Sequence, residues 1–171
     1  SRSFALPDGF CKGRVLLHFG AVDQACRIFI NSHEAGAHEG GYLPFKLDIT
    51  PMIKLGENRL VVMVRDFSDN TYAARGKQKL KRGGIWYTAQ SGIWQTVWIE
   101  SVPENYIRSI KITPLFDEAA VELAVDAPRG LEVNAAVMDD ESLIAEACFC
   151  SESSARLELP GFKQWSPESP Y

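Results

Sequence analysis

Apolar and polar residues alternate along most of this 171-residue chain, and that period of two constrains the fold more than any other feature. In residues 14–19 (RVLLHF), Val15, Leu17 and Phe19 fall on one face of an extended chain, because successive side chains of a β-strand point to opposite sides. Helical periodicity is scarce, so the sequence predicts an all-β protein. The other stretches with this pattern are 25–31, 58–66, 96–102, 106–115, 119–126, 131–139, 143–150 and 155–160.

Two stretches depart from the simple alternation. Residues 50–58 (TPMIKLGEN) predict a short helix, with Thr50 as its N-cap, Pro51 at the first helical position and Gly56 at its end. Residues 60–64 are apolar at every position, which predicts a strand buried on both faces within a sandwich.

The composition changes near residues 103–106 (PENY). All three histidines and most of the aromatic residues precede this point, whereas shorter strands rich in Glu and Ala follow it. We therefore expect two β-sandwich domains, residues 1–104 and 105–171. The second is expected to have about five strands, against about seven in an immunoglobulin-like sandwich, and so to be truncated at its C-terminal edge. An open sheet edge of that kind favours a homo-oligomer, or else an unusual packing of the C-terminal segment.

Charge and cysteine content exclude several classes of function. The net charge of −4 argues against a nucleic-acid partner, and no apolar run reaches the roughly 20 residues that cross a bilayer, which argues against a membrane. The N-terminal residues lack the features of a signal peptide, which favours a cytoplasmic location. The four cysteines are Cys11, Cys26, Cys148 and Cys150. They lack zinc-site spacing and favour a reducing compartment over a disulfide framework. The last two share a strand face, where such residues usually pack as small hydrophobes.

Three of the four tryptophans lie in residues 83–100 (GGIWYTAQSGIWQTVWIE). The stretch could be an internal repeat, a platform on which sugars stack, or two buried strands that meet at a bend. Gly92 favours the bend, after which Trp94 and Trp98 fall on one face of a single strand. We expect these two indoles to be mostly buried, in the first sandwich or at the joint between the domains, and Trp86 to be partly open to solvent.

Residues 65–84 form a long segment without apolar periodicity. Five cationic residues fall within eight positions of it: Arg75, Lys77, Lys79, Lys81 and Arg82. Such a run is often only a solvated, mobile loop. Long loops of this kind are also frequently functional, and this one offers donors for the hydroxyl groups of a substrate.

The remaining polar candidates have structural explanations. Asp23 and Asp48 follow apolar runs, where carboxylates usually accept hydrogen bonds from backbone N–H groups of a loop. The histidines show no metal-ligand spacing, and His38–Glu39 does not begin an H-E-x-x-H motif because position 42 is Tyr. We expect no metal and no cofactor.

Four segments occur in an order and at spacings that resemble one known family: residues 17–50 (LHFGAVDQACRIFINSHEAGAHEGGYLPFKLDIT), 56–66 (GENRLVVMVRD), 75–78 (RGKQ) and 84–102 (GIWYTAQSGIWQTVWIESV). Together they resemble the N-terminal sugar-binding domain of glycoside hydrolase family 2, the family of β-galactosidases, β-glucuronidases and β-mannosidases. The resemblance implies a jelly-roll sandwich at residues 1–104 and a C-terminally truncated immunoglobulin-like sandwich at 105–171. It also implies a third domain outside this chain, a (β/α)₈ barrel.

In that family two glutamates on the barrel perform catalysis, so the resemblance implies no catalytic residue in this chain. Retaining glycosidases need two carboxylates about 5–5.5 Å apart. The NE-type strand of the barrel that carries them does not stand out in this sequence. The implied function is substrate binding by a non-catalytic fragment, with a β-glycoside and the barrel as its partners. The residues expected to contact the substrate are Arg75, Lys77, Gln78, Trp86 and Tyr87.

The chain departs from better-known members of the family at one position. In β-galactosidases and β-glucuronidases an Asp shortly before the SGI-like bend contacts the sugar, and the matching position falls at about Gly83 or Gly84 here. Recognition of galactose or glucuronate is therefore not transferred to this sequence. Two other functions stay open, a free-standing carbohydrate-binding module and an oligomerisation domain.

Overall fold

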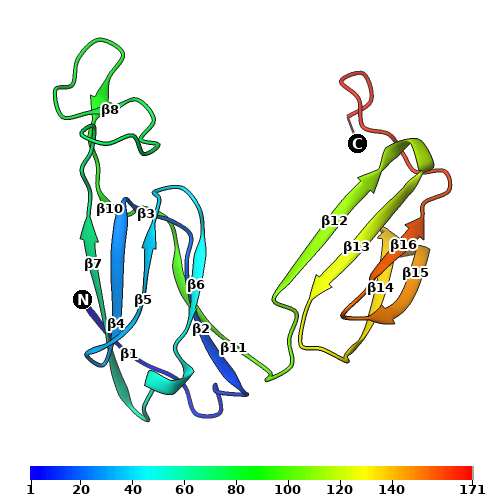
Figure 1. Ribbon diagram of the computed structural model, residues 1–171, viewed down its shortest axis with the longest axis horizontal. Helices are drawn as coiled ribbons and strands as arrows, with labels where there is room; N and C mark the ends of the chain where they lie inside the picture. The colour runs from blue at the N-terminus through cyan, green and yellow to red at the C-terminus, as the bar shows by residue number, and fades with distance from the viewer. Residues whose placement is uncertain (171) are drawn as a thin grey trace. The chain divides into compact units, whose positions relative to one another are not determined.

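The computed structural model describes residues 1–170, and contacts divide these into two compact units, Ser1–Glu104 and one that begins at Asn105 (Figure 1). Strands dominate both units, and the helices of the described residues are two 3₁₀ turns, Thr50–Met52 and Phe116–Glu118. The predicted all-β fold is confirmed. Within the described part, no helix has the length and apolar character needed to cross a membrane.

The first unit is built from two main sheets and two small ones. One main sheet has the order β1 (Arg2–Ala5), β7 (Glu57–Arg65), β4 (Ala25–Ile30), β5 (His33–Glu39), and the other has the order β11 (Val97–Val102), β2 (Arg14–Phe19), β6 (Phe45–Asp48). The small sheets pair β3 (Val22–Asp23) with β10 (Gly92–Ile93), and β8 (Gln78–Lys79) with β9 (Tyr87–Thr88).

The core of the first unit lies between its two main sheets. Val15, Leu17 and Phe19 of β2 are buried there, as the alternation predicted, and Ile28 and Ile30 of β4 are buried with them. Partly buried side chains of β6, β7 and β11 pack against this cluster. Because a period-two strand brings its apolar residues to one face, the two sheets bury a continuous apolar layer and together form a sandwich.

The helix predicted at residues 50–58 is only a 3₁₀ turn. Its N-cap is Ile49 rather than Thr50, and its C-cap is Ile53. The Thr50 hydroxyl instead accepts a hydrogen bond from the Val15 N–H (2.8 Å) and donates one to the Asp48 carboxylate (2.5 Å). Thr50 therefore ties the end of β6 to the start of β2, and this use of its side chain competes with helix capping.

The expectation that residues 60–64 are buried on both faces is wrong. Leu60 and Val62 of β7 pack against the core, but Met63 and Val64 are exposed. Met63 lies on the face of this sheet that the opposing sheet does not cover. Val64 shares the face of Leu60 and Val62 but is still 38% exposed near the end of β7, so the apolar run did not indicate burial on both sides.

The described residues of the second unit form five strands in two sheets. One sheet has the order β12 (Ser109–Leu115), β13 (Ala120–Asp126), β16 (Ser154–Glu158), and the other pairs β14 (Glu132–Asp139) with β15 (Ser142–Cys150). Apolar residues of β12, β13 and β14 line a hollow of about 460 Å³, and Ile110 and Ile112 are largely exposed. All four cysteines are free thiols, and Cys148 and Cys150 are exposed rather than packed as predicted.

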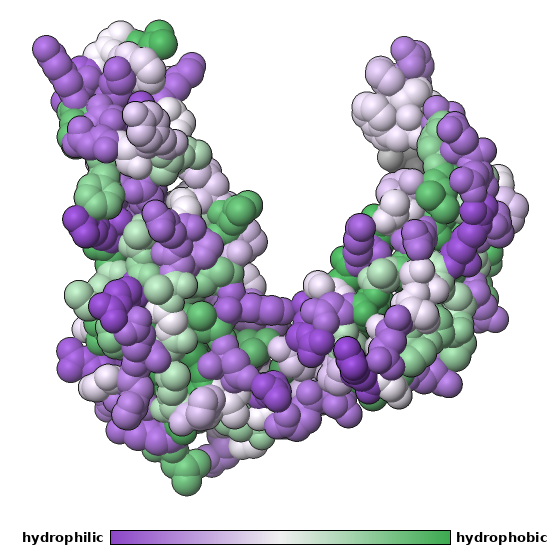
Figure 2. All heavy atoms as spheres, viewed as in Figure 1, coloured by the Kyte–Doolittle hydropathy of each residue, from purple (hydrophilic) through white to green (hydrophobic). Residues whose placement is uncertain are grey.

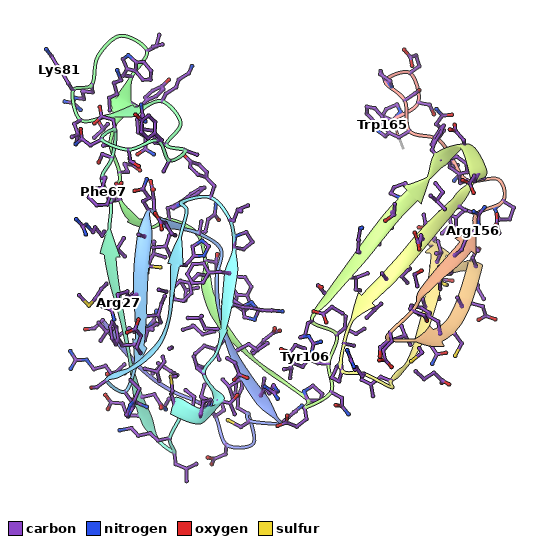
Figure 3. All side chains as sticks on the ribbon, viewed as in Figure 1. Arg27, Phe67, Lys81, Tyr106, Arg156 and Trp165 are labelled. Atoms are coloured by element: carbon purple, nitrogen blue, oxygen red, sulfur yellow. The ribbon has the colours of Figure 1, made fainter. Side chains whose placement is uncertain are left out.

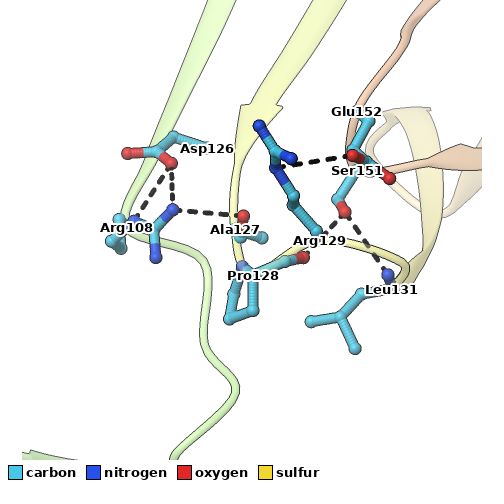
Figure 4. Close-up of polar contacts among 8 residues, drawn as sticks. All are labelled: Arg108, Asp126, Ala127, Pro128, Arg129, Leu131, Ser151 and Glu152. Atoms are coloured by element: carbon cyan, nitrogen blue, oxygen red, sulfur yellow. Dashed lines mark hydrogen bonds and ion pairs between the residues drawn. The ribbon is translucent and has the colours of Figure 1, made fainter.

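Polar contacts close one end of the second unit (Figure 4). The Arg108 guanidinium donates to the Asp126 carboxylate and to the Ala127 carbonyl (3.1 Å), which joins the start of β12 to the end of β13. The Ser151 hydroxyl donates to the Pro128 carbonyl (2.8 Å) and accepts from the Leu131 N–H (3.3 Å). These bonds satisfy turn groups that the sheets leave unpaired.

Candidate functional site

The long segment between β7 and β10 folds as one module, residues 66–91, which extends beyond the main sheets of the first unit (Figure 1). Its strands β8 and β9 pair in parallel, with Gln78 opposite Tyr87. Gly83 and Trp86 exchange two backbone hydrogen bonds (3.1 and 3.2 Å), and the turn between them places Gly84 at φ +59°. Glycine fits this turn because it adopts a positive φ without steric cost.

Asp66 fastens both ends of the module. Its carboxylate accepts a hydrogen bond from the Ser68 N–H (2.6 Å) at the first end. It also accepts one from the Ser91 hydroxyl at the other end. The segment is therefore closed into a loop at its base, and its two ends are held beside β3 and β10.

A pocket of about 270 Å³ lies at the base of the module. This volume is near the lower end of the range for small-molecule sites, about 300–1,000 Å³. Its lining combines a carboxylate, two amides, two hydroxyls and an indole, drawn from β3, β8, β10 and the neighbouring loops: Asp23, Tyr42, Gln78, Gln90, Ser91, Gly92, Ile93 and Trp94.

Asp23 is the one acidic residue of the pocket lining, and it is only 8% exposed. Burial raises the pKa of its carboxyl group, and the nearby negative charge of Asp66 raises it further. A hydrogen bond with the Gln78 side chain opposes this rise. The Gln78 carbonyl oxygen also accepts a hydrogen bond from the Gln90 N–H (2.7 Å), so this amide joins Asp23 of β3 to Gln90 of the module.

Trp94 forms one wall of the pocket. Its indole N–H donates to the Gly41 carbonyl (2.7 Å), and the Tyr42 ring meets it edge to face at 5.7 Å between centroids. The indole is nevertheless 51% exposed. A half-exposed ring that these two contacts hold in place can stack on a ligand without further ordering.

The structure brings only one of the five predicted contact residues into the pocket, namely Gln78. Arg75 donates to the Thr71 carbonyl within the module (3.0 Å), and Lys77 is exposed. Tyr87 of β9 is exposed, and Trp86 packs beneath Lys79, whose ammonium lies 4.2 Å from the centre of the indole. All five belong to the module, but the other four lie outside the pocket lining.

Sequence reasoning missed Asp23, Tyr42, Gln90 and Ser91 as pocket residues. The sequence predicts only a loop carboxylate at Asp23, and nothing in its local sequence indicates that Gln78 reaches it from a distant segment. The signal that could have found the site was Trp94 beside the Gly92 bend, since the sugar platform was one of the interpretations of that stretch.

The burial expected for Trp94 and Trp98 is wrong, whereas Trp86 is partly open to solvent, as expected. Trp94 and Trp98 are 51% and 44% exposed, whereas Trp86, expected to be the open one, is 36% exposed. β10 ends at Ile93 and β11 begins at Val97, so the residues between them interrupt the strand and the two indoles do not share a strand face. Each indole instead has its own partner, the Gly41 carbonyl for Trp94 and the His18 ring for Trp98.

A larger hollow of about 600 Å³ lies between the edges of the two main sheets. Side chains such as Phe4, Phe10, Leu60 and Val62 give it a mainly apolar lining. Apart from the Trp98 indole, its polar side chains are Ser1 and Arg2, whereas the smaller pocket combines a carboxylate, two amides and two hydroxyls, so the smaller pocket is the better candidate for a binding site. Across residues 1–170, no group of three or more His, Cys, Asp or Glu side chains is arranged to hold a metal ion.

Comparison with known families identifies the first unit. The family model "Glycosyl hydrolases family 2, sugar binding domain" matches residues 1–103. The chain belongs to glycosyl hydrolase family 2. The predicted resemblance is therefore confirmed, and the pocket lies within the part of this family 2 chain that the model describes as sugar binding.

Individual relatives agree with this assignment. A β-galactosidase of Aeromonas hydrophila is 27% identical over 100% of this chain, which covers 18% of that protein. A putative β-glucuronidase of Formosa agariphila is 28% identical over 90% of the chain, which covers 19% of that protein. A solved β-glucuronidase of Ruminococcus gnavus has the same fold, with a TM-score of 0.79 and 23% identity over 99% of this chain and 31% of its own. This family 2 chain thus spans less than a third of these relatives.

Proposed function

We propose that this chain is a non-catalytic part of a family 2 glycoside hydrolase and that it binds a sugar of the substrate in the pocket at the base of the module. The observation that carries the proposal is the pocket lining, in which Asp23, Gln78 and Ser91 face the same space as the exposed indole of Trp94. Hydroxyl groups need such acceptors and donors, and the C–H face of a pyranose packs on an indole.

Catalysis is assigned to residues outside this chain. The chain matches only 18% and 19% of the lengths of two family 2 relatives, which supports a (β/α)₈ barrel with paired glutamates as its partner in hydrolysis of a β-glycosidic bond. We further propose that residues 1–104 are a jelly-roll domain and residues 105–171 a partial immunoglobulin-like sandwich. The two separate compact units and the five strands of the second support this division.

The proposal is tested by NMR titration of the 171-residue protein with the methyl β-glycosides of glucose and galactose. We expect the indole N–H signal of Trp94 and the side-chain amide signals of Gln78 and Gln90 to shift. Trp165, an exposed indole of the second unit (Figure 3), is an internal control whose signal should stay in place.

Matched variants sharpen this test. Gln78→Ala removes the amide that links Asp23 to Gln90 and should weaken sugar binding. Gln164→Ala, at an exposed position of the second unit, should leave the affinity unchanged. Equal shifts of Trp94 and Trp165, or the same affinity in both variants, would rule out the pocket as a sugar site.

The exposed apolar hollow of the second unit favours one alternative, an oligomerisation domain. Ile110 and Ile112 of β12 are exposed beside this hollow, and pairing of two copies would remove them from water. Sedimentation equilibrium should then show a dimer whose dissociation constant rises when Ile112 is replaced by Lys. A protein that stays monomeric at all concentrations and still binds sugar would rule out the oligomerisation role and leave the sugar-binding role.

A further inference from the structure

Cationic residues gather in the outer part of the module and acidic ones are absent from it. Residues 70–99 contain no Asp or Glu, although the chain as a whole carries a net charge of −4. Within them, residues 71–88, here called the cationic segment, hold five positive side chains: Arg75, Lys77, Lys79, Lys81 and Arg82. Figure 2 shows hydrophilic side chains gathered at the outer end of this module.

The positive charges of the cationic segment are not neutralised by the protein. Elsewhere several arginines pair with carboxylates, as Arg27 does with Glu34 and Arg156 with Glu118. Among the ion pairs of residues 1–170, none involves a cation of the cationic segment. Like charges held close together without counter-charges repel one another, so an anion bound there would relieve this repulsion.

Several of these cations are held in position by neutral groups. Arg75 donates through one Nη to the Thr71 carbonyl (3.0 Å), while its Nε is shielded from solvent and has no hydrogen-bond partner. Arg82 donates to the Thr88 hydroxyl (3.3 Å). Lys79 lies over the Trp86 ring at 4.2 Å. Such contacts orient the cations and leave their charge available to a ligand.

Exposed apolar and aromatic side chains stand among the cations. Tyr72, Leu80, Ile85 and Tyr87 are all more than half exposed. Lys81 lies at the outer end of the segment, whereas Phe67 lies near its base (Figure 3). A surface of cations and aromatic rings suits a ligand that combines anionic groups with apolar C–H faces, as an acidic sugar does.

We propose that the cationic segment is a subsite for an acidic unit of a glycan, recognised through a uronate carboxylate or a sulfate ester. This inference rests on the proposed function and names the substrate class of the same module. The pocket at the base of the module presents the buried carboxyl of Asp23, which disfavours an anion there. The two regions therefore select different groups of one chain: hydroxyl groups at the pocket and an anionic group at the cationic segment.

The test measures binding of polysaccharides to the 171-residue protein by affinity electrophoresis and titration calorimetry. The probes are polygalacturonate for uronate, carrageenan for sulfate ester, dextran as the neutral control and single-stranded poly(dT) as a non-glycan polyanion. We expect at least one acidic glycan to bind more tightly than dextran and poly(dT), with an affinity that falls as salt rises from about 20 to about 200 mM. The better of the two acidic probes identifies the group.

Charge-matched variants locate the site. The triple variant Lys77→Gln, Lys81→Gln, Arg82→Gln should bind the acidic glycan about tenfold more weakly, since each exposed charge contact contributes modestly. The control variant Lys12→Gln, Lys54→Gln, Lys111→Gln removes the same charge from exposed positions elsewhere and should change the affinity less than about twofold. Circular dichroism checks that each variant is folded. The single variant Lys81→Glu supplies a second test, which changes one residue instead of three.

Several outcomes would overturn the inference. They are equal losses in the two triple variants, equal or tighter binding of poly(dT), and no binding of either acidic glycan at low salt. The Gln78→Ala variant separates this inference from the proposed function. Acidic glycan binding should survive Gln78→Ala if the cationic segment is the site, whereas binding of neutral methyl glycosides should weaken if the pocket is the sugar site.

Discussion

The imidazole of His18 lies flat against the indole of Trp98, with ring centroids 4.7 Å apart and planes inclined by 8°. The two residues are directly opposite on β2 and β11. His18 also approaches Glu100, with 2.8 Å between Nε2 and the carboxylate. Since Leu17 and Phe19 of β2 point into the core, His18 and Trp98 lie on the outer face of that sheet.

Because Trp98 lies on this outer face, Trp98→Ala should cost less stability than the loss of a fully buried tryptophan. We expect it to reduce the free energy of unfolding by about 1–2 kcal/mol, because a half-exposed ring loses one stacked partner and part of its burial. A fully buried tryptophan would lose about 3–5 kcal/mol. Urea unfolding of the variant measures the difference. Phe19→Ala, at a fully buried position, is the comparison and should lie in the higher range; equal losses would contradict the assignment.

Gly41→Ala should destabilise the first unit. A Cβ at position 41 would lie 2.6 Å from the Asp23 carboxylate oxygen, and Asp23 is buried and has little room to move. We expect a loss of about 1–3 kcal/mol, as for other overpacked sites. Asp23→Ala removes the obstructing atoms, so the double variant should be less destabilised than the sum of the single ones. Strict additivity in thermal unfolding would show that the two positions do not clash.

Asp48 should make the protein less stable in acid. Burial raises the pKa of this carboxyl group, but hydrogen bonds from Thr50 and the contact with Arg14 outweigh burial and leave the pKa below its usual value of 3.8. The resulting stability is present above pH 3.8 and is lost as the pH falls through the folded-state pKa. Asp48→Asn should therefore flatten the acid side of the stability curve measured by urea unfolding. An unchanged slope would contradict this.

Asp23 should act in the opposite direction. Burial, aided by the charge of Asp66, raises the pKa of Asp23 above 3.8, so its contribution to stability is full below that pH and is lost as the pH rises through the folded-state pKa. Asp23→Asn removes this loss. The variant should gain stability relative to the native protein as the pH rises from about 3 to about 7. A difference that shrinks over that interval would mean that the carboxylate is better stabilised than its burial implies.

The 171-residue protein should not hydrolyse glycosides. The reaction requires two suitably spaced carboxylates, and the acidic member of the pocket lining is Asp23 alone. Release of nitrophenol from nitrophenyl β-galactoside and β-glucuronide should equal that of a mock preparation. Turnover that disappears in an Asp23→Asn, Asp66→Asn variant would show instead that these two carboxylates form a catalytic pair.

The sequence by itself determined the all-β class, the core face of β2 and the family. These features depend on local periodicity and on motifs, which do not require knowledge of distant contacts. The resemblance also pointed to the module, and Gln78, one of the five residues expected to contact the substrate, lines the pocket.

Only the tertiary structure decided where the pocket is and which tryptophans are exposed. Asp23, Gln78 and Trp94 are far apart in the sequence and meet because β3 pairs with β10 while Asp66 closes the base of the module. Likewise, the strand break between Ile93 and Val97 gives Trp94 and Trp98 separate partners, which period-two reasoning could not foresee. Burial and proximity depend on which elements pack together, and that is a property of the folded chain as a whole.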